Sequence, residues 1–157
     1  MLTVSDTSPI CYLILIDKID LLWKLCDRVV IPQAVYEELR ASNSPRTVQS
    51  WLEKTPDWLK IQSVVVDIDN DIKSLDAGEQ EAILLAEEIN ADLILIDEKR
   101  GRKIATNRGL KVLGLLGLLG TAANEGLIDF ESTIMSLQMT NFWVSPKLLQ
   151  RLLEKYS

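Results

Sequence analysis

Residues 91–109, ADLILIDEKRGRKIATNRG, join an apolar run to an acidic pair and then to a basic, helix-favouring segment. The run LILI contains no polar residue, which is typical of a strand that is buried on both faces of a parallel sheet. The residues after Asp97 predict a helix that Gly109 ends. A buried strand followed directly by a helix is the repeating unit of α/β folds.

The same alternation extends over the rest of the 157 residues, which fit a single domain. Further strands are expected at LTVSD (2–6), RVVI (28–31), KIQSVVV (60–66) and LKVLG (110–114), and apolar or amphipathic helical segments lie between them. This order predicts an α/β three-layer sandwich with a mainly parallel central sheet and helices on both faces.

Composition narrows the chemistry that the chain can perform. It contains no histidine, two cysteines and a formal net charge of −6. The absence of histidine excludes Ser-His-Asp and Cys-His catalysis and imidazole-ligated zinc. Cys11 and Cys26 stand in apolar surroundings and are interpreted as buried free thiols. No apolar run reaches the ~18 residues of a membrane span, and no basic leader precedes Asp6, so we expect a cytoplasmic protein without membrane association.

Four short acidic motifs lie where expected strands end or expected helices begin. They are Asp6 in VSDTSP, Glu37 and Glu38 in VYEEL, Glu79 and Glu81 in DAGEQEA, and Asp97 in LILIDE. The carboxyl ends of parallel strands meet at one edge of a sheet, which would bring several of these acids together. Carboxylates that lie close repel each other, so the sequence favours a divalent cation among them.

Each acidic motif also has a structural interpretation of its own. Acidic residues are favoured at helix N-termini, and we assign the cap of the helix over 78–90 to Asp76 or Ser74. Glu37 and Glu38 fit a solvated helix face. The metal site is therefore indicated by the joint arrangement of the four motifs and not by any one of them.

The order and spacing of the motifs resemble the PIN-domain nucleases, in particular the VapC-like toxin group. The resemblance rests on VSDTSP, VVIPQAVYEEL, LDAGEQEAILLA, ADLILIDEKRGRKIA and LKVLGLLGLL, and it spans residues 3–127. It implies a PIN-like fold in which four acids bind Mg²⁺ or Mn²⁺ and hydrolyse RNA. By motif, these catalytic and metal-binding acids are Asp6, Glu38, Glu81 and Asp97, with Glu79 as the rival for the third place and Glu98 as further support for Asp97.

Hydroxyl and basic side chains flank the first and last of these acids. Thr7 and Ser8 follow Asp6 and would donate hydrogen bonds to a phosphate or to a metal-bound water. Lysine and arginine residues after Asp97 would contact the RNA backbone, unless they form an ordinary solvated helix face. The basic residues are Lys99, Arg100, Arg102, Lys103 and Arg108.

The function that the resemblance implies is a divalent-metal-dependent endoribonuclease, the toxin of a toxin–antitoxin pair. Such a protein would form a homodimer and be silenced by a small antitoxin. The alternative is an RNA-binding or interaction module of the same fold whose acids bind metal poorly, because many relatives have Asp at the third place. A receiver-like phosphorelay domain is disfavoured, since only one acid follows the first strand.

The last thirty residues, 128–157, are expected to form a helical extension of the same domain. ESTIMSLQM and SPKLLQRLLEKY predict helices, and Phe142 and Trp143 lie between them. The segment is apolar enough to pack against the domain or against a partner, and we interpret it as packing against the domain.

Overall fold

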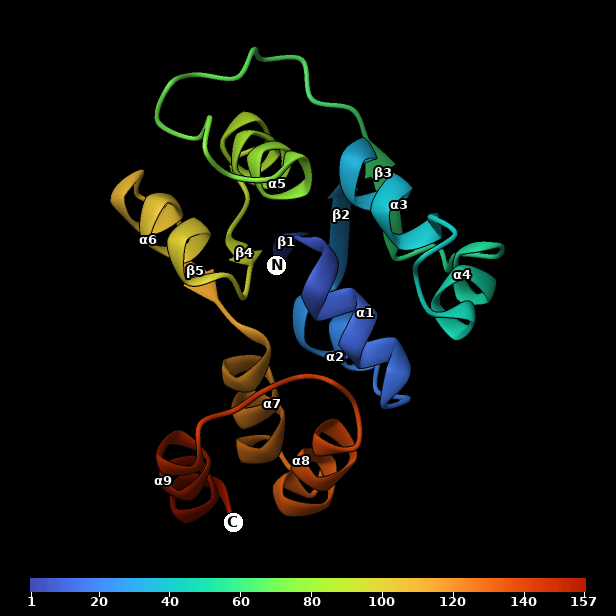
Figure 1. Ribbon diagram of the computed structural model, residues 1–157, viewed down its shortest axis with the longest axis vertical. Helices are drawn as coiled ribbons and strands as arrows, with labels where there is room; N and C mark the ends of the chain where they lie inside the picture. Colours follow the sequence, from blue (N-terminus) through green and yellow to red (C-terminus); the bar gives the residue numbers. More distant parts are fainter.

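A five-stranded parallel sheet forms the centre of the computed structural model, which describes residues 1–157 (Figure 1). The strand order is β3-β2-β1-β4-β5, and every neighbouring pair is parallel. The expected α/β fold with a parallel sheet is therefore confirmed. The strands are β1 Leu2–Ser5, β2 Arg28–Pro32, β3 Leu59–Gln62, β4 Leu93–Leu95 and β5 Val112–Leu113.

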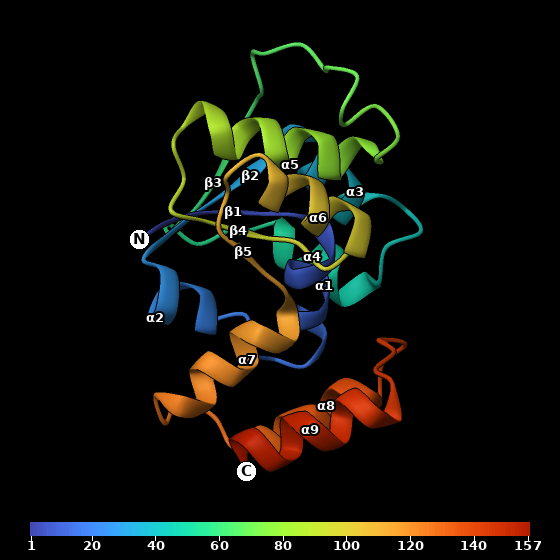
Figure 2. The ribbon, with the colours of Figure 1, turned by 90° about the vertical axis from the view of Figure 1, so that its left-hand side faces the viewer.

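Nine helices surround this sheet, and two of them cover one face while most of the others lie on the opposite side (Figure 2). The pair on one face is α5 and α6, which pack over β1 and β4. The helices are α1 Thr7–Leu15, α2 Leu21–Cys26, α3 Gln33–Arg40, α4 Arg46–Leu52, α5 Ala77–Glu88, α6 Lys99–Asn107, α7 Leu115–Asn124, α8 Phe130–Gln138 and α9 Pro146–Tyr156.

Alternate strand residues enter two separate hydrophobic clusters, one on each face of the sheet. In β2, Val29 and Ile31 belong to the larger cluster, and Val30 belongs to the smaller one beneath α5. The strand period of two residues produces this division, because successive side chains point to opposite faces. Helices cover both faces of β2 and β4, which explains why these two strands consist of continuous apolar runs.

The strand expected over 60–66 ends four residues early, at Gln62. Its neighbour β2 ends at Pro32, which is in register with Gln62, so no partner backbone remains beyond this point. Val65 and Val66 are exposed, and the Val65 N–H donates to the carboxylate of Glu88 at 3.2 Å. The edge strand β3 therefore ends where β2, the only strand it pairs with, ends.

The chain changes direction across the sheet between β1 and β4. From β1 it proceeds to β2 and β3 on one side, and it later returns to add β4 and β5 on the other. Such a reversal leaves a crevice outside the carboxyl ends of the two central strands, where α/β proteins bind their ligands. Asp6 directly follows β1, and its N–H donates to the carbonyl of Leu95 in β4 at 2.9 Å.

The C-terminal segment is partly core and partly surface. Phe130, Ile134 and Leu137 of α8 are buried in the larger cluster, as expected for packing against the domain. Trp143, between α8 and α9, is largely exposed, and so is Met139. None of the helices combines the length and the apolar character that crossing a membrane requires.

Candidate metal centre

A cavity of about 750 Å³ opens at the carboxyl ends of β1 and β4. Acidic side chains from four separate segments of the chain line one part of it, and hydroxyl and basic groups lie among them. These polar residues are Asp6, Thr7, Ser8, Glu38, Asp76, Glu79, Asp97, Glu98 and Arg102. The topology of the sheet thus gathers acids that are more than ninety residues apart in the sequence.

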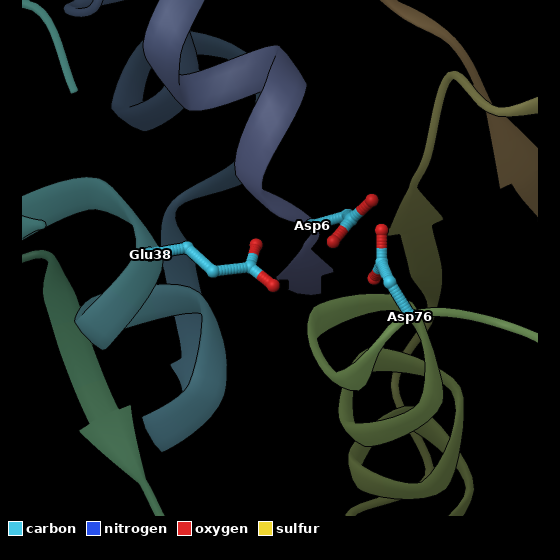
Figure 3. Close-up of side chains that lie close together, drawn as sticks. All are labelled: Asp6, Glu38 and Asp76. Carbon is cyan, nitrogen blue, oxygen red and sulfur yellow. The ribbon is translucent and has the colours of Figure 1, made fainter. Parts of the chain in front are cut away.

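Three carboxylates converge most closely within this cavity. Figure 3 shows Asp6, Glu38 and Asp76 extending toward one another from the start of α1, from α3 and from the start of α5. One oxygen from each lies within 4.8 Å of the other two. We call this set, together with Asp97 and Glu79, the acid cluster.

The carboxylate of Glu38 is held by two donors. The Thr7 hydroxyl donates to Glu38 Oε2, and the backbone N–H of Gly78 donates to Glu38 Oε1 at 3.2 Å. A Cβ at residue 78 would lie 2.7 Å from Glu38 Oε2, so the bare backbone of Gly78 leaves room for this carboxylate. Because α3 buries Val35 and Leu39, Glu38 is left at the rim of the core beside the cavity.

Asp76 was interpreted from the sequence as one of two helix caps, and the structure gives it that role. Its Oδ1 accepts the N–H of Glu79 at 2.8 Å, and Glu79 Oε1 accepts the N–H of Asp76 at 3.4 Å, a reciprocal capping box. Capping of this kind occupies one oxygen of Asp76, while a carboxylate has two. The sequence reasoning stopped at the cap and missed Asp76 as a candidate metal ligand.

Glu79 is the rival third acid of the sequence analysis, and the residue is buried, with 6 % of its surface exposed. Its Oε2 has no hydrogen-bond partner. A Cβ at residue 101 would lie 2.7 Å from this oxygen, so the bare backbone of Gly101 in α6 makes room for it. Glu79 thus lies between the cap of α5 and the start of α6, at the wall of the cavity.

Asp97 follows β4, and the start of α7 holds its carboxylate in place. Its Oδ1 accepts the N–H of Leu115, the first residue of α7, at 2.7 Å. Its Oδ2 is buried and has no hydrogen-bond partner, and the same is true of Asp6 Oδ1. Buried carboxylate oxygens without donors are rare in folded proteins, and they need a proton or a cation.

Comparison with known proteins places this chain in a family. A model of the PIN-domain family DUF3368 matches residues 2–157. The chain belongs to this PIN-domain family. The match includes the C-terminal helices, beyond residues 3–127 on which the sequence resemblance rested. No curated protein matches the chain significantly.

A solved structure also shares the fold of this PIN domain. It is a PilT N-terminus domain protein from the hyperthermophilic archaeon Sulfolobus solfataricus, 15 % identical in sequence, with a TM-score of 0.53. The similarity covers 92 % of this chain and 100 % of the archaeal chain. At this identity the similarity extends to the fold alone.

Burial raises the pKa values of three acids of this PIN domain, Asp6, Glu79 and Asp97. Burial raises the pKa of Asp6 to about 7, the Thr7 N–H opposes this, and the nearby charges of Asp76 and Glu38 add to it. Burial also raises the pKa of Glu79 well above its usual range, with Asp76 as the next cause. Desolvation raises the pKa of Asp97 as well, against the opposing effect of the Leu115 N–H. Groups with such shifts bind protons readily, and a cation would replace those protons.

Glu81, which the sequence analysis assigned to the third place, is not brought to the acid cluster. Its Oε1 accepts the N–H of Ala34, at the start of α3, at 3.0 Å, and it does not line the cavity. Residues two apart on a helix point about 200° from each other, so only one of Glu79 and Glu81 can face the site. The structure directs Glu79 there, and the assignment of Glu81 is corrected accordingly.

Only some of the basic and hydroxyl residues that the sequence pointed to lie at the cavity. Thr7, Ser8 and Arg102 line the cavity, as does Glu98, the N-cap of α6. Lys99, Arg100 and Lys103 are exposed on α6 outside the cavity lining. Arg108 does not join them, because Asp69, Asp71 and Glu87 surround its guanidinium.

The donor set fits a hard divalent cation. All five side chains of the acid cluster offer oxygen, which Mg²⁺ and Mn²⁺ prefer, and neither histidine nor cysteine lies among them. None of the four ion pairs of the protein involves these acids. Asp6, Glu38 and Asp76 are placed to hold one ion together.

Proposed function

We propose that this PIN domain is a divalent-metal-dependent endoribonuclease. One observation carries the proposal: three carboxylates converge at the switch point of the sheet with buried, unpaired oxygens nearby and no basic side chain paired to them. Bringing these carboxylates together on folding costs free energy. A bound cation would relieve their repulsion, so it would bind tightly and stabilise the folded state. Family membership supports the same activity.

The residues would divide the work between metal binding and substrate binding. Asp6, Glu38 and Asp76 would hold Mg²⁺ or Mn²⁺, which when bound offsets phosphate charge and activates water for hydrolysis of a phosphodiester bond. Asp97 and Glu79 add negative charge beside these three ligands. The Thr7 hydroxyl orients Glu38 by hydrogen bonding, so it acts on the ligand set and not on the substrate.

The polynucleotide needs a cationic contact, since the protein as a whole is acidic. Arg102 lines the cavity beside Asp97 and makes no ion pair, so its guanidinium can contact a phosphate there. Lys99, Arg100 and Lys103 extend the same helix outside the cavity, where they would attract the RNA backbone at longer range.

A cleavage assay with a single-stranded RNA oligonucleotide tests the proposal. The purified protein is expected to cut it with Mn²⁺ or Mg²⁺, and excess EDTA should stop the reaction. Asp6→Asn should reduce the rate at least about 100-fold, because even residues that only support metal ligands commonly cost 10–100-fold. Metal-independent cleavage, or full activity in Asp6→Asn, would exclude this mechanism. RNA binding without cleavage would favour the alternative of a non-catalytic module.

The toxin role extends the proposal from the chemistry to the cell. It rests on the VapC-like resemblance, and the homodimer and the small antitoxin that it implies stay predictions. Induced expression of the wild-type chain should arrest growth, while Asp6→Asn should not. Equal growth of the two strains at equal protein levels would remove the toxin role and leave the nuclease proposal intact.

A further inference from the structure

The cavity that holds the acid cluster has a second, aromatic wall. Besides the polar residues it is lined by side chains from α1, from the α8–α9 connection and from α9. They include Tyr12, Phe142, Trp143, Leu148 and Leu152. One cavity thus combines a site suited to a metal with a surface suited to a flat, apolar group.

The aromatic wall is fastened to the same helix that begins at the acids. The ring of Phe142 packs edge-on against Tyr12, with centroids 5.0 Å apart and planes at 76°. The Tyr12 hydroxyl donates to Asn141 Oδ1 at 2.6 Å. Figure 2 shows the α8–α9 connection returning toward α1, where Tyr12 lies one turn and a half after Asp6. The position of Trp143 relative to the acids is therefore set by the fold.

Trp143 itself remains 78 % exposed. A single exposed aromatic residue is ordinary on a protein surface, and Trp23, at 46 %, is another example. Trp143 differs because it borders the cavity of the acid cluster while its neighbour Phe142 anchors the backbone. Its indole ring is free to cover a ligand that enters this cavity.

We propose that Trp143 stacks on an unpaired base of single-stranded RNA, next to the phosphate that lies at the acid cluster. This inference rests on the proposed nuclease function. The cavity would then contact the RNA in three places. Trp143 would stack on the base, and Arg102 would contact a phosphate. The acids would hold the cation beside the bond that is cut. Stacking on aromatic rings is the common way in which proteins hold unpaired bases, and a duplex does not offer such bases.

The size and charge of the cavity favour a nucleotide over a protein segment. A volume of about 750 Å³ lies in the range of small-ligand sites. A ligand that covers Trp143 and reaches the acids must be short and must bring its negative charge to the metal side, which a nucleotide does. A protein partner on Trp143 is the competing occupant, and the experiment below separates the two.

The test measures cleavage of a single-stranded oligonucleotide in Mn²⁺ by wild type, Trp143→Ala, Trp143→Phe and the matched control Trp23→Ala. Loss of a base-stacking ring should raise KM about tenfold or more in Trp143→Ala, with kcat nearly unchanged. Trp143→Phe should keep most of the affinity, and Trp23→Ala should match wild type. Melting temperatures should be equal for wild type and Trp143→Ala, because the ring is exposed.

A second set of substrates locates the stacked base. Oligonucleotides that lack one base at successive positions around the cleavage point should show a single position at which wild type loses affinity. Trp143→Ala should lose nothing further at that position, since the ring that met the base is already gone.

The outcomes separate this inference from the proposed function. No metal-dependent cleavage by wild type would overturn both. Cleavage by wild type with an unchanged KM in Trp143→Ala would overturn the stacking role alone. A changed oligomeric mass in Trp143→Ala with an unchanged KM would assign the ring to a protein interface and would also overturn it.

Discussion

Two groups of acidic side chains lie on the same α/β frame, and only one of them has a basic partner. Arg108 meets Glu87 at 2.6 Å, Asp69 at 3.0 Å and Asp71 at 3.4 Å. We call these four residues the arginine clasp. The acid cluster gathers five carboxylates, of which Asp6 and Glu79 are buried, and none of the five forms an ion pair.

The pKa shifts of the two groups run in opposite directions. Hydrogen bonding to Arg108 lowers the pKa of Asp69, and the hydrogen bonds that Arg108 donates to Glu87 are the main cause that raises the pKa of Arg108. In the acid cluster, burial raises the pKa of Asp6 to about 7. In the arginine clasp, the guanidinium of Arg108 neutralises the acids. The acid cluster has no ion-paired basic side chain, so we infer that it binds a cation from solution.

The arginine clasp also explains how the acid cluster is assembled. Asp69 and Asp71 belong to the long connection between β3 and α5, and this connection ends at the cap Asp76. Arg108, just beyond the end of α6, and Glu87 in α5 hold the connection against the helices that cover the sheet. One acidic group thus keeps in place the segment that supplies an acid to the other.

The largest effect that we expect is a pH dependence of the free energy of unfolding, and Asp6 is its source. Its pKa is raised in the folded state, so its contribution to stability is full below pH 4 and is lost as pH rises through 7. Without metal, Asp6→Asn should gain about 3 kcal/mol of unfolding free energy relative to wild type between pH 5 and pH 8. Urea denaturation of both proteins in EDTA measures this gain, and a constant difference would show that folding does not raise the pKa of Asp6.

The next effect distinguishes two glutamates of one helix. Glu79→Gln should weaken Mn²⁺-dependent cleavage about 10–100-fold, because it removes a charged group of the acid cluster. Glu81→Gln is the matched control, since Glu81 accepts a hydrogen bond from Ala34 outside the cavity. Its rate should stay within about twofold of wild type. The reverse pattern would restore Glu81 to the third place.

A smaller effect is expected from breaking the arginine clasp. Arg108→Met should cost about 1 kcal/mol of unfolding free energy, since most of the partner carboxylates are solvent-exposed. Added Mg²⁺ should leave that loss unchanged, whereas it should stabilise the wild-type acid cluster. Arg100→Met, at an exposed position without an ion pair, is the control. A loss in Arg108→Met that Mg²⁺ fully restores would mean that the clasp itself binds metal.

The smallest effect concerns the unpaired basic residues of α6. Alanine in place of Lys99, Arg100 or Lys103 should each weaken RNA binding only slightly and lower the slope of log affinity against log salt by about 0.7. Arg108→Ala should not change this slope, because its guanidinium is already engaged by acids. Equal slopes for all variants would place the RNA backbone away from α6.

Part of the acid cluster was predicted from the sequence, because strand ends are local features. Asp6 and Asp97 follow apolar runs, and the α/β alternation alone predicts that such ends meet. Glu38, the second acid that the family resemblance implies, lies beside the buried Leu39 at the rim of the cavity. The two cysteines are free, as expected, although Cys11 is only partly buried.

The rest depended on information that one sequence does not contain. Choosing between Glu79 and Glu81 requires the rotation of α5 about its axis, and the buried run from Ala82 to Ala86 is too broad to fix it. Arg108 was grouped with the basic residues of its helix because its acidic partners lie up to 39 residues away. The contact that places Trp143 at the cavity joins Tyr12 to Phe142, across 130 residues.

Calorimetric titration of the metal-free wild-type protein with Mn²⁺ at pH 8, alongside Asp6→Asn, tests the central claim most directly. If the acid cluster lacks a cation that solution must supply, wild type should bind Mn²⁺ with saturable heat and release protons, and Asp6→Asn should bind it at least about tenfold more weakly. Absence of binding by wild type at millimolar Mn²⁺, or equal binding by both proteins, would contradict the claim.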